Sequence, residues 1–212
     1  MQGRHTRAET RTRSRRGPAP WLVVLLLAAA LLVFALVRTF GWLSQRKSAD
    51  AIVLVNQWNS VENTGFHPKL KTVEGVRVDE RLERPMTELL TAARAAGLAP
   101  VPADGYLDAE EENGDGCFRP GYSEHELGLA VHFRAADDRE AELSEWLQAN
   151  AWRYGFILRY PESAAEVTGI VSTEHYRFVG EAVAEQIRTM GISLEEYLDL
   201  FYGDSAEVVF EK

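Results

Sequence analysis

A run of apolar residues near the N-terminus, Trp21 to Val37, divides this chain into two parts that must fold in different surroundings. The apolar character continues to Leu43, interrupted mainly by Arg38 and Thr39, and aromatic residues stand near both ends of the run. A helix of this length spans a hydrocarbon layer of about 30 Å when its flanking aromatics sit at the two interfaces. We therefore expect a transmembrane helix over residues 21–43.

The segment that precedes this run, residues 1–20, is strongly basic. It holds six arginines against a single acid, Glu9. Because flanking positive charge keeps a segment in the cytoplasm, the tail is expected there and the remainder of the chain outside the plasma membrane. A cleaved signal peptide is the alternative, but its apolar core is usually shorter, and no Ala-x-Ala-like site follows here.

Residues 44–50 form a short polar linker, and residues 51–212 are long enough for one domain with its own core. From Ser44 onward the chain carries 16 Lys and Arg against 31 Asp and Glu, a net charge of −15. Such a surface repels nucleic acid, so we expect no nucleic-acid partner. The single cysteine, Cys117, excludes an intramolecular disulfide.

The periodicity of the domain predicts an α+β fold, with helices flanking a small, mostly antiparallel sheet. Pro85 places the start of the first helix close to it, Asp138 is expected to cap the second, and Ser193 with Glu196 forms a capping box for the last. Residues 62–71 are predicted as a loop. The expected strands are 51–55, 98–101, 129–133, 156–159 and 175–179, and the expected helices are 79–96, 138–154, 181–190 and 193–202.

An acidic run over residues 110–116 lies in a turn-rich connection between the predicted strands. Consecutive carboxylates without the spacing of metal ligands are typical of a solvated loop, which is the reading we adopt.

Three of the five histidines fall where a metal site could form. His125 and His132 are seven residues apart, and Gly128 lets the chain bend between them. His132 shares one strand face with Ala130, and His175 begins another predicted strand. A catalytic zinc ion takes three protein ligands and keeps one position for water. The three imidazoles are therefore candidate zinc ligands, although any single histidine is more often structural.

Two segments that contain these histidines resemble the motifs of the VanY-type D-alanyl-D-alanine carboxypeptidases. The chain is similar to the Ser-x-His-x-x-Gly-x-Ala-x-Asp motif of that family over residues 123–132, to its GF-x-x-RYP segment over 155–161, and to its Thr-Gly and Glu-x-Trp-His-x-Arg-Tyr-x-Gly elements over 168–180. The resemblance implies a zinc D,D-peptidase fold, a bacterial source, and peptidoglycan stem peptide as the partner. It also implies Ser123, Tyr122 and Arg177 as candidate substrate contacts.

The chain departs from the family motifs at positions that perform chemistry. The ligand aspartate of the family is His132 here, and its general-base glutamate is Ser172. A three-histidine zinc site can still acidify water, whereas a missing base costs about 10² to 10⁴ in rate. Glu174 is chemically suitable as a base, but its place next to His175 on a strand points it to the opposite face.

A further departure lies upstream, where the family carries an arginine for substrate charge and this chain has Leu107. The loss of a charge-assisted contact is worth roughly 1.5–3 kcal/mol. Arg119 or Arg159 could take its place.

Three functions remain open at this point. The first is a membrane-anchored relative with weakened or lost hydrolysis that binds stem peptide or an extracytoplasmic protein. The second is an active zinc carboxypeptidase that trims stem peptides, and the third is a metal-free structural module.

Overall fold

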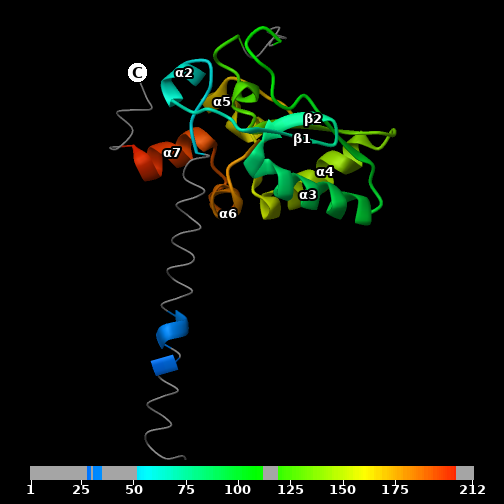
Figure 1. The fold of residues 1–212 in the computed structure, drawn as a ribbon, viewed down its shortest axis with the longest axis horizontal. Helices are drawn as coiled ribbons and strands as arrows, with labels where there is room; N and C mark the ends of the chain where they lie inside the picture. The colour runs from blue at the N-terminus through cyan, green and yellow to red at the C-terminus, as the bar shows by residue number, and fades with distance from the viewer. Residues whose placement is uncertain (1–27, 30, 35–51, 112–118, 204–212) are drawn as a thin grey trace, which may run out of the picture. The chain divides into compact units, whose positions relative to one another are not determined.

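The computed structural model describes residues 28–29, 31–34, 52–111 and 119–203 of the chain (Figure 1). Residues 28–29 and 31–34 are helical. The predicted transmembrane segment 21–43 lies for the most part outside the described residues, and the linker 44–50 and the basic tail lie wholly outside them. Within the part of the chain that is described, no helix has the length and hydropathy needed to cross a bilayer.

A four-stranded sheet forms the centre of the domain. Its order is β3 (Pro100–Ala103), β4 (Ala130–Ala135), β6 (His175–Phe178) and β5 (Phe156–Leu158), and each neighbouring pair is antiparallel. A two-stranded hairpin of β1 (Leu70–Val73) and β2 (Val76–Asp79) forms a second sheet. With the helices described next, these sheets confirm the predicted α+β class.

The register of the central sheet decides which residues share a face. His132 pairs directly with His175, and Ala130 pairs with Arg177. Because successive side chains on a strand point to opposite faces, Val131, Phe133 and Tyr176 face the other way. These apolar residues belong to the larger core cluster. The sheet therefore has one apolar face and one face that carries histidine and arginine.

Helices cover the sheet and complete two cores. Helices α3 (Glu83–Ala95) and α4 (Glu140–Asn150) contact each other and pack on the apolar face through Met86, Leu89 and Leu147. Helices α6 (Glu181–Met190) and α7 (Leu194–Tyr202) form a smaller core with Ile157. Short helices and 3₁₀ turns connect these elements. The two four-residue helices are α2 (Val61–Thr64) and α5 (Ala165–Thr168), and the 3₁₀ turns are η1 (Glu80–Leu82), η2 (Glu124–Leu127), η3 (Ala151–Tyr154) and η4 (Glu162–Ala164).

Most predicted helices and strands are present, with shifts at their ends. Helix α6 has the predicted bounds, α3 begins two residues before Pro85, and the capping box at Ser193 is formed. The predicted cap at Asp138 is wrong, because Arg139 is the N-cap of α4 and makes no side-chain bond there.

Two predictions in the N-terminal part of the domain are wrong. Residues 52–55 belong to neither sheet, although Leu54 and Val55 are buried. The predicted loop 62–71 contains most of α2 and the start of β1. The hairpin was missed, yet its turn residues Glu74 and Gly75 both have positive φ, as a two-residue hairpin turn requires.

Candidate metal site

The segment before β4 places the first histidine of the site. Ser123 caps η2 by accepting a hydrogen bond from His125 N, and Glu126 closes the capping box. Gly128 then turns the chain with a φ of 64°, and a Cβ there would lie 2.9 Å from Asp79 N. The cap and the glycine turn together hold His125 at a fixed distance from β4.

The three predicted ligands His125, His132 and His175 converge. Their candidate ligand atoms all lie within 4.8 Å of one another, and their ring centroids are 4.8 to 5.1 Å apart. Nε2 of His132 lies 3.1 Å from Nδ1 of His175. Each histidine comes from a different element, so the fold gathers residues that are up to 50 positions apart in the sequence.

Each imidazole has an oxygen acceptor at its other ring nitrogen. Nδ1 of His125 lies 2.7 Å from the Gly105 carbonyl oxygen, and Nδ1 of His132 lies 3.1 Å from a carboxylate oxygen of Asp104. Nε2 of His175 lies 3.3 Å from a carboxylate oxygen of Glu124. A carbonyl or carboxylate only accepts, so these partners assign the N–H to the outer nitrogen of each ring. The remaining nitrogens then present lone pairs to one another, which is the arrangement that a zinc ion requires.

Burial keeps His175 in the neutral form that a metal ligand needs. His175 is 1% exposed, and its burial lowers its pKa to about 3, against the opposing effect of Glu124. A neutral imidazole at physiological pH is available for coordination without first losing a proton.

A network of buried charged side chains contacts His175 at its outer nitrogen. The Glu124 carboxylate accepts from Arg159 Nε at 2.8 Å and lies 3.0 Å from a guanidinium nitrogen of Arg177, and all three side chains are fully buried. Burial alone would raise the pKa of Glu124, but the two guanidinium groups bring it well below its ordinary value. Glu124 is therefore ionised, as a strong acceptor for His175 must be.

The same network reaches the last helix of the domain. Both oxygens of the Glu195 carboxylate accept from Arg159, at 2.8 and 2.6 Å, and one of them accepts from Asn56. Helix α7 is thereby connected through Arg159 and Glu124 to the histidine cluster.

The candidates for a general base have other hydrogen-bond partners. The Ser172 hydroxyl accepts from the backbone N–H of His175 at 3.3 Å. Glu174 accepts from Arg134 Nε at 2.9 Å, so its carboxylate is engaged by a cation on the neighbouring strand. Asp104 and Glu124 contact the imidazoles, but each holds an outer nitrogen.

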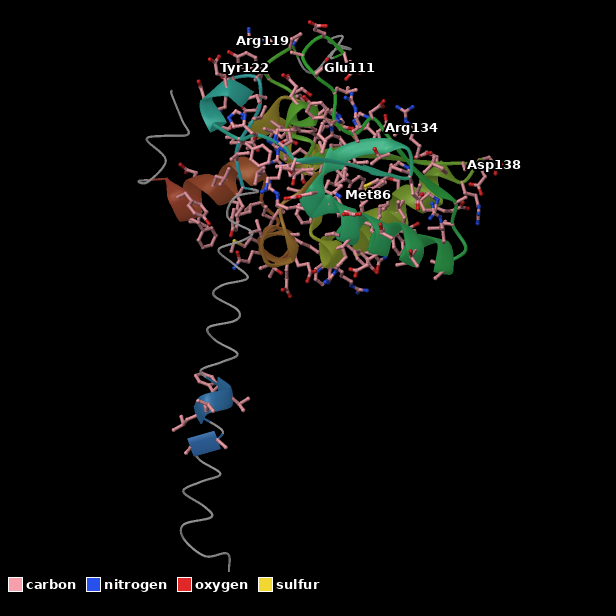
Figure 2. All side chains as sticks on the ribbon, in the orientation of Figure 1. Met86, Glu111, Arg119, Tyr122, Arg134 and Asp138 are labelled. Atoms are coloured by element: carbon pink, nitrogen blue, oxygen red, sulfur yellow. The ribbon has the colours of Figure 1, made fainter. Side chains whose placement is uncertain are left out.

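The predicted substrate contacts have different surroundings. Ser123 and Arg177 are fully buried, and Arg177 donates to the backbone oxygens of Phe178 and Val53. Tyr122 is half-buried, with the Arg119 guanidinium 3.8 Å from its ring centroid; both are labelled in Figure 2. Arg159 lies in the buried network, whereas Arg119 is exposed. The substrate role of Ser123, Tyr122 and Arg177 stays a prediction.

Sequence reasoning missed the groups that orient the rings. Glu124 stands next to His125 in the sequence, and Asp104 and Gly105 directly follow β3. Only the fold shows that they meet the histidines. A signal for Glu124 existed, because the two arginines of the family motifs, Arg159 and Arg177, need a buried counter-charge.

Comparison with known proteins agrees with this geometry. The VanY family profile, described as D-alanyl-D-alanine carboxypeptidase, matches residues 109–181. A bifunctional D-Ala-D-Ala dipeptidase and carboxypeptidase, VanXYC of Enterococcus gallinarum, is 31% identical over 69% of this chain and 75% of its own length. This chain belongs to the VanY-type D-alanyl-D-alanine carboxypeptidase family. The D-alanyl-D-alanine carboxypeptidase of Enterococcus faecalis (strain ATCC 700802 / V583) is 33% identical over 70% of this chain.

Solved structures of VanY-type proteins have the same fold. VanYB in complex with D-alanine-D-alanine is 33% identical, with a TM-score of 0.66 over 70% of this chain and 97% of the other. A VanY variant in complex with Zn(II) has the same identity and TM-score and is covered over 99% of its length. This chain spans 66%, 45% and 37% of the relatives from Enterococcus faecalis, Enterococcus faecium and Bacillus subtilis.

Proposed function

We propose that this VanY-type protein holds zinc through His125, His132 and His175 and binds the D-alanyl-D-alanine end of peptidoglycan stem peptides, with hydrolysis much slower than an intact family site would give. The observation that carries the proposal is the set of three converging imidazoles with acceptors on their outer nitrogens. Zinc bound there would supply a Lewis acid and lower the pKa of a bound water.

The residues of this chain explain why we expect slow hydrolysis. A general base must reach the attacking water, and the Ser172 hydroxyl at the family's base position cannot accept its proton near neutral pH. The Glu174 carboxylate is held by Arg134. A missing base corresponds to a loss of about 10² to 10⁴ in rate.

An active zinc carboxypeptidase is the second candidate. It is favoured by the three-histidine ligand set, which is found in catalytic zinc sites, and by the described activity of the relatives. In that case Glu174 would have to leave Arg134 to act as the base. A metal-free module is the third candidate, and convergent lone pairs are a poor arrangement for it, because they repel one another.

We further propose that residues 21–43 anchor the protein in the bacterial plasma membrane, with the domain on the outer side. The apolar run and the arginine-rich tail support this location. It would place the site next to peptidoglycan.

The test uses full-length protein purified without a histidine tag. Zinc content is measured first, then binding of a stem pentapeptide by calorimetry, then release of D-alanine. We expect about one zinc per chain, measurable peptide binding, and release at least 100-fold slower than for VanYB under the same conditions. The matched control is His125→Ala, which should lose both zinc and peptide.

Each other outcome selects a different function. Zinc-dependent release at a rate close to that of VanYB would establish the active enzyme, and Glu174→Gln would then show whether that carboxylate is its base. Absence of zinc after loading would establish the metal-free module. Zinc without peptide binding would point to a protein as the extracytoplasmic partner.

A further inference from the structure

We propose that Asp104 is the positioning residue that makes His132 a zinc ligand, by fixing its tautomer and ring orientation. This inference rests on the zinc site of the proposed function, and it concerns a residue that does not touch the metal.

The contact geometry assigns Asp104 this role. Its carboxylate oxygen lies 3.1 Å from Nδ1 of His132, while Nε2 of the same ring lies 3.1 Å from His175. Since a carboxylate accepts and cannot donate when ionised, Nδ1 carries the proton and Nε2 keeps its lone pair for the metal. The ring cannot rotate about its Cβ–Cγ bond without losing this bond.

The backbone of Asp104 has a left-handed conformation, which is unusual for a residue other than glycine. Its φ is 45°, one of two positive values among the non-glycine residues of the described chain. Left-handed backbone costs a non-glycine residue free energy and persists where the surroundings enforce it. The preceding residue, Ala103, is the strand partner of His132, so this turn brings the carboxylate to Nδ1 of the ring.

The next residue, Gly105, also fixes this turn. A Cβ on Gly105 would lie 2.3 Å from the Arg77 carbonyl oxygen, so only glycine fits. The Gly105 carbonyl oxygen contacts Nδ1 of His125. Two consecutive residues, Asp104 and Gly105, therefore orient two of the three imidazoles.

Arg134 lies close to the same Asp104 oxygen that contacts His132. It lies two residues after His132 on β4, on the same face, and its guanidinium is 3.6 Å from the Asp104 oxygen. Its Nε donates to Glu174. Arg134 is exposed and is labelled in Figure 2. A cation beside Asp104 attracts its carboxylate and limits its movement.

Asp104 also matches imidazole rather than carboxylate at position 132. Two carboxylates at this separation would repel each other and raise the pKa of one of them. With imidazole, the carboxylate instead accepts a hydrogen bond and increases the basicity of the ligand nitrogen.

The test is the zinc affinity of the full-length protein, measured by competition with a chromophoric chelator. Loss of such an outer partner typically weakens metal binding 10- to 100-fold, which is the fall expected for Asp104→Ala. Asp104→Asn can still accept the N–H through its amide oxygen, so a smaller fall is expected. Glu174→Gln removes the other acid on Arg134 and should change the affinity less than threefold.

A double-variant cycle separates orientation from charge. In a His132→Gln background there is no imidazole to orient, so Asp104→Ala should alter zinc affinity less than twofold. Urea denaturation midpoints identify any variant that is merely unfolded. If Asp104→Ala is unfolded, the zinc affinity of Asp104→Asn is compared with that of the parent instead.

Three outcomes would overturn the inference. The first is a parent protein that binds zinc while Asp104→Ala binds it equally well. The second is an equal fall for Glu174→Gln, which would indicate net charge alone. The third is an undiminished effect of Asp104→Ala in the His132→Gln background. If the parent binds no zinc, the proposed function itself fails, and this inference fails with it.

Discussion

A single buried carboxylate connects the stability of this domain to its candidate metal site. Glu124 is fully buried, and it meets Arg159, Arg177 and His175. Buried ion pairs contribute little compared with apolar packing, but removal of one partner leaves the other charges without compensation. Glu124 therefore serves both the two guanidinium groups and the orientation of a ligand.

The variant Glu124→Gln tests this dual role. We expect the free energy of unfolding to fall by about 3–5 kcal/mol, because the buried guanidinium groups of Arg159 and Arg177 lose a shared carboxylate and Arg159 keeps only that of Glu195. Urea denaturation followed by circular dichroism measures the change. The exposed Glu145→Gln on α4 is the control and should stay within about 0.5 kcal/mol of the parent. A change of the same small size for Glu124→Gln would contradict the assignment.

The sequence was sufficient to identify the histidines that converge, but not the groups that contact their outer nitrogens. His125, His132 and His175 could be predicted because each stands in a motif, and the structure brings them together. Asp104 and Glu124 could not, because a carboxylate in a loop or beside a histidine has no periodic signal. Their roles depend on a strand register and on a left-handed turn, which are properties of the folded chain.

At the scale of elements, the C-terminal helix is connected to the site by one acidic residue. Glu195 on α7 accepts two hydrogen bonds from Arg159 and one from Asn56. The remainder of α7 packs through Leu194, Tyr197 and Leu198. The polar connection sets the position of the helix, while the apolar residues provide its burial.

Replacement of Glu195 by alanine should loosen this helix. We expect amide hydrogen exchange in residues 194–202 to become roughly tenfold faster, which corresponds to about 1.4 kcal/mol. Exchange in α3, which lies in the other core, should stay unchanged. The exposed Glu185→Gln on α6 is the matched control. Unchanged exchange in α7 would show that its apolar contacts alone position it.

Elements with strong local signals were predicted best. Helix α6 and the capping box of α7 follow directly from helical periodicity and from Ser193 with Glu196. The hairpin of β1 and β2 was not predicted, because Gly65 and Pro68 are typical of a loop. Residues 52–55 look like a strand by composition, yet they pair with neither sheet, and Leu54 and Val55 are buried without such pairing.

At the scale of the whole molecule, zinc should contribute to the stability of the domain. A ligand at 100 times its dissociation constant stabilises the folded state by about 2.7 kcal/mol. We therefore expect scanning calorimetry to show a melting temperature several degrees higher with zinc than with chelator. His175→Ala should abolish the difference. An unchanged melting temperature with bound zinc would contradict the prediction.

The metal-free protein should lose stability in acid. The pKa of His175 is about 3 in the folded state, below the ordinary 6.5, and the pKa of Glu124 is also lowered. Between pH 6.5 and 3 the unfolded chain therefore binds more protons, so unfolding becomes easier as the pH falls, by up to about 1.4 kcal/mol per pH unit for each proton. Urea titrations in chelator at several pH values measure the slope.

Replacement of the titrating ring gives the control for this slope. His175→Gln removes one group and should flatten the dependence between pH 6.5 and 4.5. A slope that is the same in both proteins would assign the acid sensitivity to other groups.

The direct pairing of His132 with His175 across β4 and β6 would give a bound zinc ion a role in folding. A shift of one residue in the register of these strands would move one ring to the opposite face of the sheet and leave an incomplete ligand set. Only the correctly aligned strands would bind the cation, so zinc binding would favour the native register. Mispaired chains would remain metal-free and would be degraded more easily by proteases.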